Sequence, residues 1–143
     1  MKKRLKKHIQ AKDFVKIYLA DQDGFELYRF DGIIRDQNDD YILMVDFTDL
    51  TYDGVVVFRK ADVSEIKHSK NEIFFNTVLA QEGFKDKALK KANKLGLHLN
   101  DFKGMIEQVK TQKLPLILER LYEKETKFQI GSVNKIGKKK GPY

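Results

Sequence analysis

Tyr41-Ile42-Leu43-Met44-Val45-Asp46-Phe47 is the stretch that decides the fold class, because all but one of its residues are apolar or aromatic. A short apolar run between turn residues predicts a strand that is covered on both faces. Similar runs lie on either side of it, and we expect strands at 14–20, 25–36, 41–47, 55–59 and 63–67. Five short strands joined by polar turns predict a small, strongly bent antiparallel barrel over residues 12–68.

The hydrophobic period changes on both sides of this barrel segment. Leu5 and Ile9 lie at helical spacing among lysines, so we expect residues 1–11 to form a basic arm or a short helix. After the barrel, apolar residues recur every three or four positions, and Gly83 supplies a helix stop. This pattern predicts two or three short helices over residues 69–113.

The last segment predicts a β-hairpin followed by a tail. Residues 114–136 contain two strand-like runs around a polar turn, and Gly131 lies inside the second run much as Gly32 lies inside an earlier strand. We therefore interpret 114–136 as the first hairpin of a second, incomplete barrel. Residues 137–143 form a basic tail rich in glycine and lysine. Together these elements predict an α+β fold.

Charge is divided unevenly along the chain, whose net charge is +7. Residues 1–12 carry six basic residues and no acidic one, whereas residues 13–69 carry six basic and 13 acidic residues, a net charge of −7. Residues 70–143 carry 16 basic and eight acidic residues, a net charge of +8. Any contact with phosphates would come from the two ends, because an acidic barrel repels a nucleic-acid backbone.

Composition excludes several classes of protein and site. The chain has no cysteine, which excludes disulfides, thiolate catalysis and sulfur-ligated zinc. No apolar run approaches the roughly 20 residues of a membrane span, and the basic start lacks the apolar segment of a signal peptide. No glycine-rich phosphate loop or activated nucleophile is recognisable. We expect a cytoplasmic, non-enzymatic protein without cofactor or metal that does not act at a membrane.

Two stretches resemble a known family: Asp53-Gly54-Val55-Val56-Val57-Phe58-Arg59-Lys60-Ala61-Asp62 and the strand at 128–133. The family consists of uncharacterised bacterial proteins in which an Sm-like or SH3-like barrel is followed by helices and a second such barrel. The likeness in layout covers residues 14–136. The resemblance implies an Sm-like or SH3-like barrel at 12–68 and does not imply any activity. The chain ends where most of the second barrel would follow, so the hairpin belongs to a truncated or diverged barrel or completes another sheet.

Two groups of basic residues are candidate nucleic-acid contacts. The first, in the N-terminal arm, is Lys2, Lys3, Arg4, Lys6 and Lys7. The second, on a predicted helix, is Lys87, Lys90, Lys91 and Lys94, with Lys85 beside them. The alternative interpretations are a solvated terminus or an arm lying on the acidic barrel for the first group, and the solvated face of an amphipathic helix for the second.

Three further groups are better explained by ordinary structural roles. Acidic residues near turns could ligate a hard cation or act as an acid–base pair, but they usually cap backbone N–H groups; they are Asp39, Asp40, Asp46, Asp49 and Asp53. Strand tyrosines could stack on bases, but they usually pack across strands; they are Tyr18, Tyr28, Tyr41 and Tyr52. The histidines are too dispersed in the sequence to predict a shared site; they are His8, His68 and His98.

The first function hypothesis is a non-enzymatic interaction module. It would bind a protein partner or a second copy of itself through the barrel edge and the C-terminal hairpin, because the second barrel is incomplete. The alternative is RNA or DNA binding by the basic arm and the helical lysines. The Sm-like resemblance favours this alternative, whereas the charge of −7 on the barrel opposes it.

Overall fold

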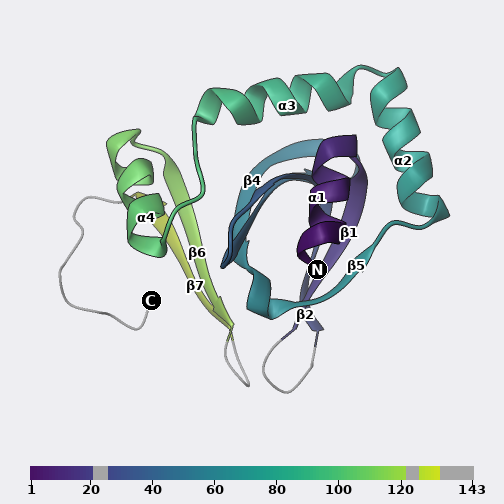
Figure 1. The fold of residues 1–143 in the computed structure, drawn as a ribbon. Coiled ribbons are helices and arrows are strands. Elements are labelled where there is room, and N and C mark those ends of the chain that lie inside the picture. Colours follow the sequence, from purple (N-terminus) through teal and green to yellow (C-terminus); the bar gives the residue numbers. More distant parts are fainter. Residues whose placement is uncertain (21–25, 122–125, 133–143) are drawn as a thin grey trace.

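The computed structural model describes residues 1–20, 26–121 and 126–132. Within these residues the fold is α+β, with four α-helices, an antiparallel five-stranded sheet and a two-stranded sheet (Figure 1). In chain order the elements are α1 (Lys2–Ala11), β1 (Phe14–Ala20), β2 (Glu26–Gln37), β3 (Tyr41–Thr48), β4 (Thr51–Arg59), the 3₁₀ turn η1 (Lys60–Asp62), β5 (Val63–Lys67), α2 (Lys70–Gln81), α3 (Phe84–Leu95), α4 (Phe102–Thr111), β6 (Pro115–Leu121) and β7 (Thr126–Ser132).

The five predicted antiparallel strands are confirmed, and they form an open sheet in the order β4-β3-β2-β1-β5. The sheet curls strongly (Figure 1). Shifts of strand register, which bend and twist a sheet, occur between Leu19 and Ala20, between Ile34 and Asp36, and between Asp46 and Phe47. Within the described residues, no strand pairs with the outer side of β4 or of β5.

One strand starts earlier than expected. The predicted strand at 55–59 is β4, but the structure pairs Thr51 with Thr48 and Tyr52 with Phe47 as well. The connection is a tight turn in which Asp49 and Leu50 both have positive φ, 50° and 64°. The Asp-Gly sequence that resembles a turn lies inside the strand instead, where Gly54 has φ 115° beside the register shift.

The sheet is covered on both faces, as the apolar composition of β3 predicts. Ile34 and Met44 point inside the curve, towards Leu5 of α1. Ile33 and Val45, each one position away, point to the other face, where α2 and α3 pack. The inner core is Leu5, Val15, Ile17, Leu19, Ile34, Ile42, Met44, Phe58 and Ile66. The outer core is Phe14, Ile33, Val45, Phe47, Leu79, Ala88, Leu89 and Ala92.

Helices occupy the segments where helical periodicity predicts them. The short basic helix is present as α1, which lies at the opening of the curled sheet, while α3 crosses its outer side (Figure 1). Three helices, α2, α3 and α4, fall in the segment 69–113. Gly83 and Gly96 flank α3 with φ 74° and 64°, the left-handed conformation that glycine adopts without strain. None of the helices in the described part of the chain has the length and apolar character of a membrane-spanning segment.

The C-terminal part is described only in its backbone. β6 and β7 pair antiparallel, from Pro115 opposite Ser132 to Leu121 opposite Thr126. The turn between them and residues 133–143, which include the end of the predicted hairpin and the basic tail, lie outside the described residues. The second, incomplete barrel therefore stays a prediction.

Candidate functional site

The most open feature of the five-stranded sheet is its edge strand β4. This strand is nine residues long, and its central residues Val55, Val56 and Val57 are only half-buried. Val55 packs against the outer core and Val56 against the inner core. The strand contains no lysine and no proline, which natural proteins commonly place on edge strands to block further pairing. β4 therefore presents a row of backbone groups flanked by apolar side chains.

The opposite edge, β5, is better protected. It has five residues, of which Ser64, Glu65 and Lys67 are exposed, and short charged edges pair poorly with other strands. The guanidinium of Arg4 in α1 donates a hydrogen bond to the backbone carbonyl of Ile66 in this strand. Among the described residues the two edges of this sheet thus differ: β4 is the longer and less charged edge, and no strand pairs with its outer side.

One basic residue of α1 is hydrogen-bonded to the sheet, and four lysines of the same helix are exposed. Arg4 is the anchor, because it binds the carbonyl of Ile66 and holds the helix against β5. The Nζ atom of Lys2 lies 3.9 Å from Asp39, but both side chains are highly exposed, so the pair contributes little to stability. The exposed lysines of α1 are Lys2, Lys3, Lys6 and Lys7.

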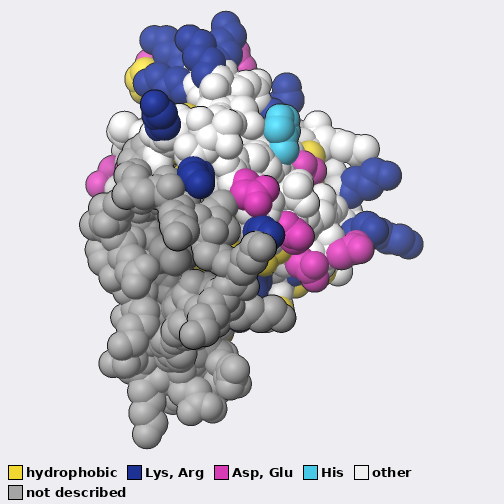
Figure 2. All heavy atoms as spheres, turned by 90° about the vertical axis from the view of Figure 1, so that its left-hand side faces the viewer, with side chains coloured by type: hydrophobic (Ala, Val, Ile, Leu, Met, Phe, Trp, Pro, Cys, Tyr) yellow, Lys and Arg dark blue, Asp and Glu magenta, His cyan; other side chains and the backbone are white. Residues whose placement is uncertain are grey.

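Four lysines of α3 are exposed, and Figure 2 shows Lys and Arg side chains gathered at the height of α3 in Figure 1. One of them, Lys91, places Nζ 5.6 Å from the ring centre of Tyr52. Leu89 of α3 belongs to the outer core and Leu5 of α1 to the inner core, so the two helices pack on opposite faces of the sheet. A nucleic acid would have to cross from one face to the other to contact both groups. The exposed lysines of α3 are Lys87, Lys90, Lys91 and Lys94.

The five candidate aspartates do not assemble into one site. Asp39 and Asp40 precede β3, whereas Asp46, Asp49 and Asp53 surround its other end. An eight-residue strand separates these groups by roughly 25 Å.

One aspartate has a perturbed acidity. Burial, and then the negative charges of Asp53 and Asp31, raise the pKa of Asp46 from 3.8 to about 6. One oxygen of Asp31 has no hydrogen-bond partner in the described part of the chain, while Asp53 accepts a hydrogen bond from Thr48 at 2.9 Å. The negative charges of Asp46, Asp53 and Asp31 therefore repel one another within the sheet.

The tyrosines do not form a single stacking platform. Tyr28 stacks on Phe30 with ring centres 6.2 Å apart, and Phe30 stacks on Phe58 at 5.7 Å, against the inner core. Tyr52 packs against the outer core. Tyr28 and Tyr52 therefore lie on different faces of the sheet.

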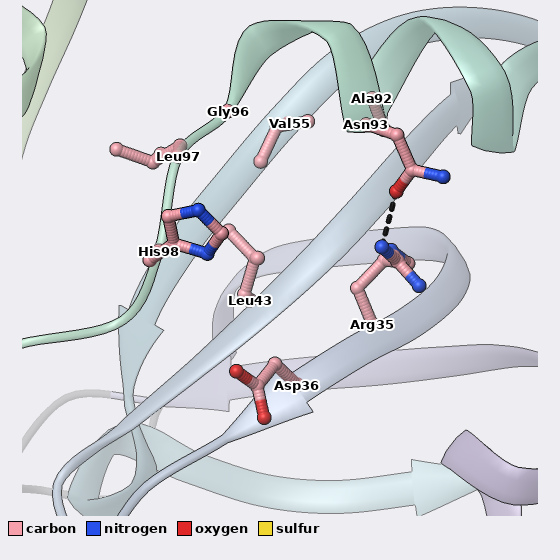
Figure 3. A pocket seen from close by; sticks show the side chains of 9 residues that line it. All are labelled: Arg35, Asp36, Leu43, Val55, Ala92, Asn93, Gly96, Leu97 and His98. Atoms are coloured by element: carbon pink, nitrogen blue, oxygen red, sulfur yellow. Dashed lines mark hydrogen bonds between the residues drawn. The ribbon is translucent and has the colours of Figure 1, made fainter.

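A shallow cleft of about 120 Å³ lies between α3 and strands β2 to β4 (Figure 3). Arg35, Asp36, Asn93 and His98 supply its polar side chains. The guanidinium of Arg35 donates to the side-chain oxygen of Asn93, which ties β2 to α3 across the cleft. Pockets for organic ligands usually enclose about 300–1,000 Å³, so this cleft has room for a few waters or a small polar molecule.

Two histidines that the sequence spacing keeps apart are neighbours in the structure. His8 of α1 and His68, which follows β5, place their ring centres 5.1 Å apart, with Asp13 beside them. The spacing of the histidines along the chain gave no sign of this proximity, and His98 lines the separate cleft.

No protein-family model, no curated protein and no solved structure matches this chain. The resemblance to the Sm-like family therefore stays a prediction.

Proposed function

We propose that this chain is a non-enzymatic interaction module that pairs its edge strand β4 with a strand of another protein chain. The observation that carries the proposal is the nine-residue edge at β4 with its half-buried valines, Val55 to Val57. Unpaired backbone groups on such an edge are a template for strand addition, in which main-chain hydrogen bonds supply affinity. The two-stranded β6–β7 sheet offers further edges of the same kind.

The partner that fits this edge best is a second copy of the chain. Two β4 strands paired antiparallel around a twofold axis at Val56 would place Val55 opposite Val57. The same register would bring the exposed Asp53 of one copy, at the bulge beside Gly54, towards the exposed Arg59 of the other, where it would share the guanidinium with Asp62. Opposite charges close to each other stabilise a strand pair, so Asp53 and Arg59 would add to the pairing of the valines.

A related proposal is that the five-stranded sheet is an Sm-like or SH3-like barrel. Five antiparallel strands, a 3₁₀ turn between the last two and a helix before the first support an Sm-like or SH3-like barrel. The two basic surfaces fit a binding module better than an enzyme. The cleft supports the same view, because its Arg35 and Asn93 are bonded to each other and hold β2 to α3.

Light scattering over a range of protein concentrations tests self-association. We expect a dimer that dissociates on dilution, and we expect Val57→Lys in the middle of the edge to weaken it by about tenfold or more. Thr51→Lys, at the exposed end of the same strand, is the matched control and should change the dimer little. A chain that stays monomeric at all concentrations would overturn self-association, and binding of a different protein would then be the remaining form of the proposal.

A charge exchange tests the register. Asp53→Arg should weaken the dimer, because it places two arginines opposite each other. Adding Arg59→Asp in the same chain should restore association, even though it removes the Arg59–Asp62 ion pair within the chain. Circular dichroism confirms that each variant is folded. Failure of the double variant to recover would contradict the register at Val56.

Nucleic-acid binding is the second candidate, favoured by the exposed lysines of α1. It predicts that the affinity for short RNAs falls steeply with salt, with a logarithmic slope of about 0.7 for each phosphate contacted. Replacing Lys2, Lys3, Lys6 and Lys7 by alanine should flatten this slope. The corresponding replacement of Lys87, Lys90 and Lys94 in α3 tests the opposite face of the sheet. A slope that neither set changes would exclude both surfaces.

A further inference from the structure

Three side chains that commonly bind metals meet where the end of α1, the start of β1 and the end of β5 come together. They are His8, Asp13 and His68, and one donor atom of each lies within 4.8 Å of the other two. Nδ1 of His8 is 2.9 Å from Oδ2 of Asp13. Nε2 of His68 is 3.9 Å from the same oxygen. Each of these three segments thus places one possible metal-ligating atom next to the same small volume.

The hydrogen bond of His68 fixes which nitrogen carries its proton. Nδ1 lies 2.9 Å from the backbone carbonyl oxygen of Phe14, and a carbonyl can only accept, so Nδ1 is the protonated nitrogen. In the neutral ring, Nε2 then carries a lone pair. This lone pair lies 3.9 Å from the oxygen of Asp13, and the same oxygen is 2.9 Å from Nδ1 of His8, which gives up its proton when a metal binds. Such an arrangement is stabilised by a cation.

The backbone holds the other two donors in place. The N–H of Asp13 donates to the carbonyl of His8 at 3.1 Å, and Lys12 between α1 and β1 adopts the left-handed conformation at φ 52°. This tight connection fixes the distance between His8 and Asp13. The side chain of His8 is only 8 % exposed, which limits its movement. A site held in this way loses little conformational entropy when a ligand binds.

We propose that His8, Asp13 and His68 bind a divalent transition-metal ion, and that Zn²⁺ is the ion the donor set fits best. Zinc takes imidazole nitrogens and carboxylate oxygens at about 2.0–2.2 Å in tetrahedral geometry, which places neighbouring donors roughly 3.4 Å apart. The observed separations of 2.9 and 3.9 Å lie on either side of this value. Three protein ligands leave a fourth position for water. The carbonyl of Phe14 is the outer partner that orients His68, as is usual for metal-bound histidines.

The donor types favour zinc over hard cations, although two lysines lie near the site. Lys12 follows α1 directly, and Lys85 of α3 interacts electrostatically with both Asp13 and Lys12. Lys85 also donates to Asn76 at 2.8 Å. Calcium and magnesium require several oxygen ligands, whereas this site has one carboxylate among positive neighbours. The two imidazole nitrogens make up for the missing oxygen ligands only when the ion is a transition metal, because such ions bind nitrogen donors well.

Metal binding would fasten α1 to the sheet. His8 belongs to α1, Asp13 lies just before β1 and His68 precedes α2, so one ion would join the α1–β1 connection to the end of β5, which is distant in sequence. This inference is independent of the β4 edge, and either proposal can fail without the other.

Cobalt and zinc titrations of the full chain test the site. Co²⁺ reports on its coordination through visible absorption, which is strong in four-coordinate sites. We expect one Co²⁺ per chain, displacement of this Co²⁺ by Zn²⁺, and a higher Tm in Zn²⁺ than in Mg²⁺. Acidification should release the metal, because imidazole nitrogens must be unprotonated to bind it. Absence of both the cobalt absorption and the Tm increase would overturn the proposal.

Substitutions locate the bound ion. His68→Ala and Asp13→Asn each remove one donor, and we expect each to weaken zinc binding by about tenfold or more. His98→Ala is the matched control, because it removes a histidine that lies in the separate cleft. Circular dichroism verifies folding, and Asp13→Asn keeps the shape of its side chain if His68→Ala fails to fold. Undiminished binding by Asp13→Asn, or loss of binding in His98→Ala, would place the metal elsewhere and refute the assignment.

Discussion

Gly32 in β2 lies so close to the backbone carbonyl of Val45 in β3 that a Cβ atom at position 32 would overlap the carbonyl oxygen. The two strands are paired at this point, with Gly32 opposite Asp46. Because the obstacle is backbone in the middle of the sheet, the neighbouring strand would have to shift to admit any side chain. The glycine thus sets how closely the curled strands approach.

Gly32→Ala should lower the free energy of unfolding by about 1–3 kcal/mol, the usual cost of forcing extra atoms into a packed region. Urea unfolding followed by circular dichroism measures the change. Gly104→Ala is the matched control, since its Cβ would meet the surface side chains of Asn100 and Asp101, and alanine favours the helix. Equal destabilisation by the two substitutions would contradict the backbone obstacle.

Leu5→Ala tests whether α1 is part of the core. Leu5 is fully buried against strands of the sheet, so truncation should cost about 2–5 kcal/mol. Phe74→Ala removes a larger apolar side chain that is 62 % exposed, and we expect a change within about 0.5 kcal/mol. Thermal and urea unfolding compare the two variants. A small effect of Leu5→Ala would mean that the helix is not docked in solution.

Asp46 should make the fold less stable as pH rises. Its pKa is 3.8 when unfolded and about 6 when folded, so the folded state holds the proton more tightly. The stabilisation is present below about pH 4 and is lost as the pH rises to about 6. Because the group is partly solvated, Asp46→Asn should stabilise the protein at neutral pH by only about 1 kcal/mol.

The check for Asp46 is urea unfolding from pH 4 to pH 7 in the wild type and the variant. Asp39→Asn serves as the control, because the side chain of Asp39 is 94 % exposed and lies at the other end of β3. A difference between wild type and Asp46→Asn that does not grow between pH 4 and pH 6 would refute the assignment.

Glu72 should have the opposite effect on the pH dependence of stability from Asp46, so that the protein loses stability as the pH falls. Burial alone would raise its pKa, but hydrogen bonds from Ser69, at 2.9 Å from the backbone N–H and 2.8 Å from the hydroxyl, outweigh it. The charges of Lys16 and Lys67 add to this effect, and the pKa of Glu72 is lowered below 4.5. A lowered folded-state pKa gives stability that is present above pH 4.5 and lost as the pH falls below it.

Glu72→Gln should therefore cost about 1 kcal/mol at neutral pH and reduce the loss of stability in acid. Unfolding at pH 7 and at pH 3 measures both effects. Glu82→Gln replaces an exposed glutamate at the end of the same helix and should leave the acid response unchanged. If wild type and Glu72→Gln lose stability equally in acid, Ser69 does not hold a charged carboxylate.

The strands and helices were predictable because each has a local pattern. The apolar run at β3 and the three- and four-residue spacing of Ala88, Leu89 and Ala92 are read directly from neighbouring residues. The start of β4 was not predictable. Its turn uses Asp49 and Leu50 at positive φ instead of the asparagine and glycine that usually mark a hairpin.

The spatial relations of the candidate sites depend on pairing between distant strands. His8 and His68 are neighbours because β1 pairs with β5, Ile17 facing Ile66, and no local pattern encodes that pairing. The openness of β4 likewise follows from the order of strands in the sheet. Exposure of the lysines was readable from helical spacing, but the separation of α1 from α3 by the sheet was not.

The anchor of α1 also sets an order of events during synthesis. Arg4 binds the carbonyl of Ile66, a residue 62 positions later. A ribosome that adds about 5–20 residues per second needs about 3–12 s to make that stretch. The hydrogen bond that ties α1 to β5 can therefore form only after β5 has left the ribosome, well after α1 itself is made.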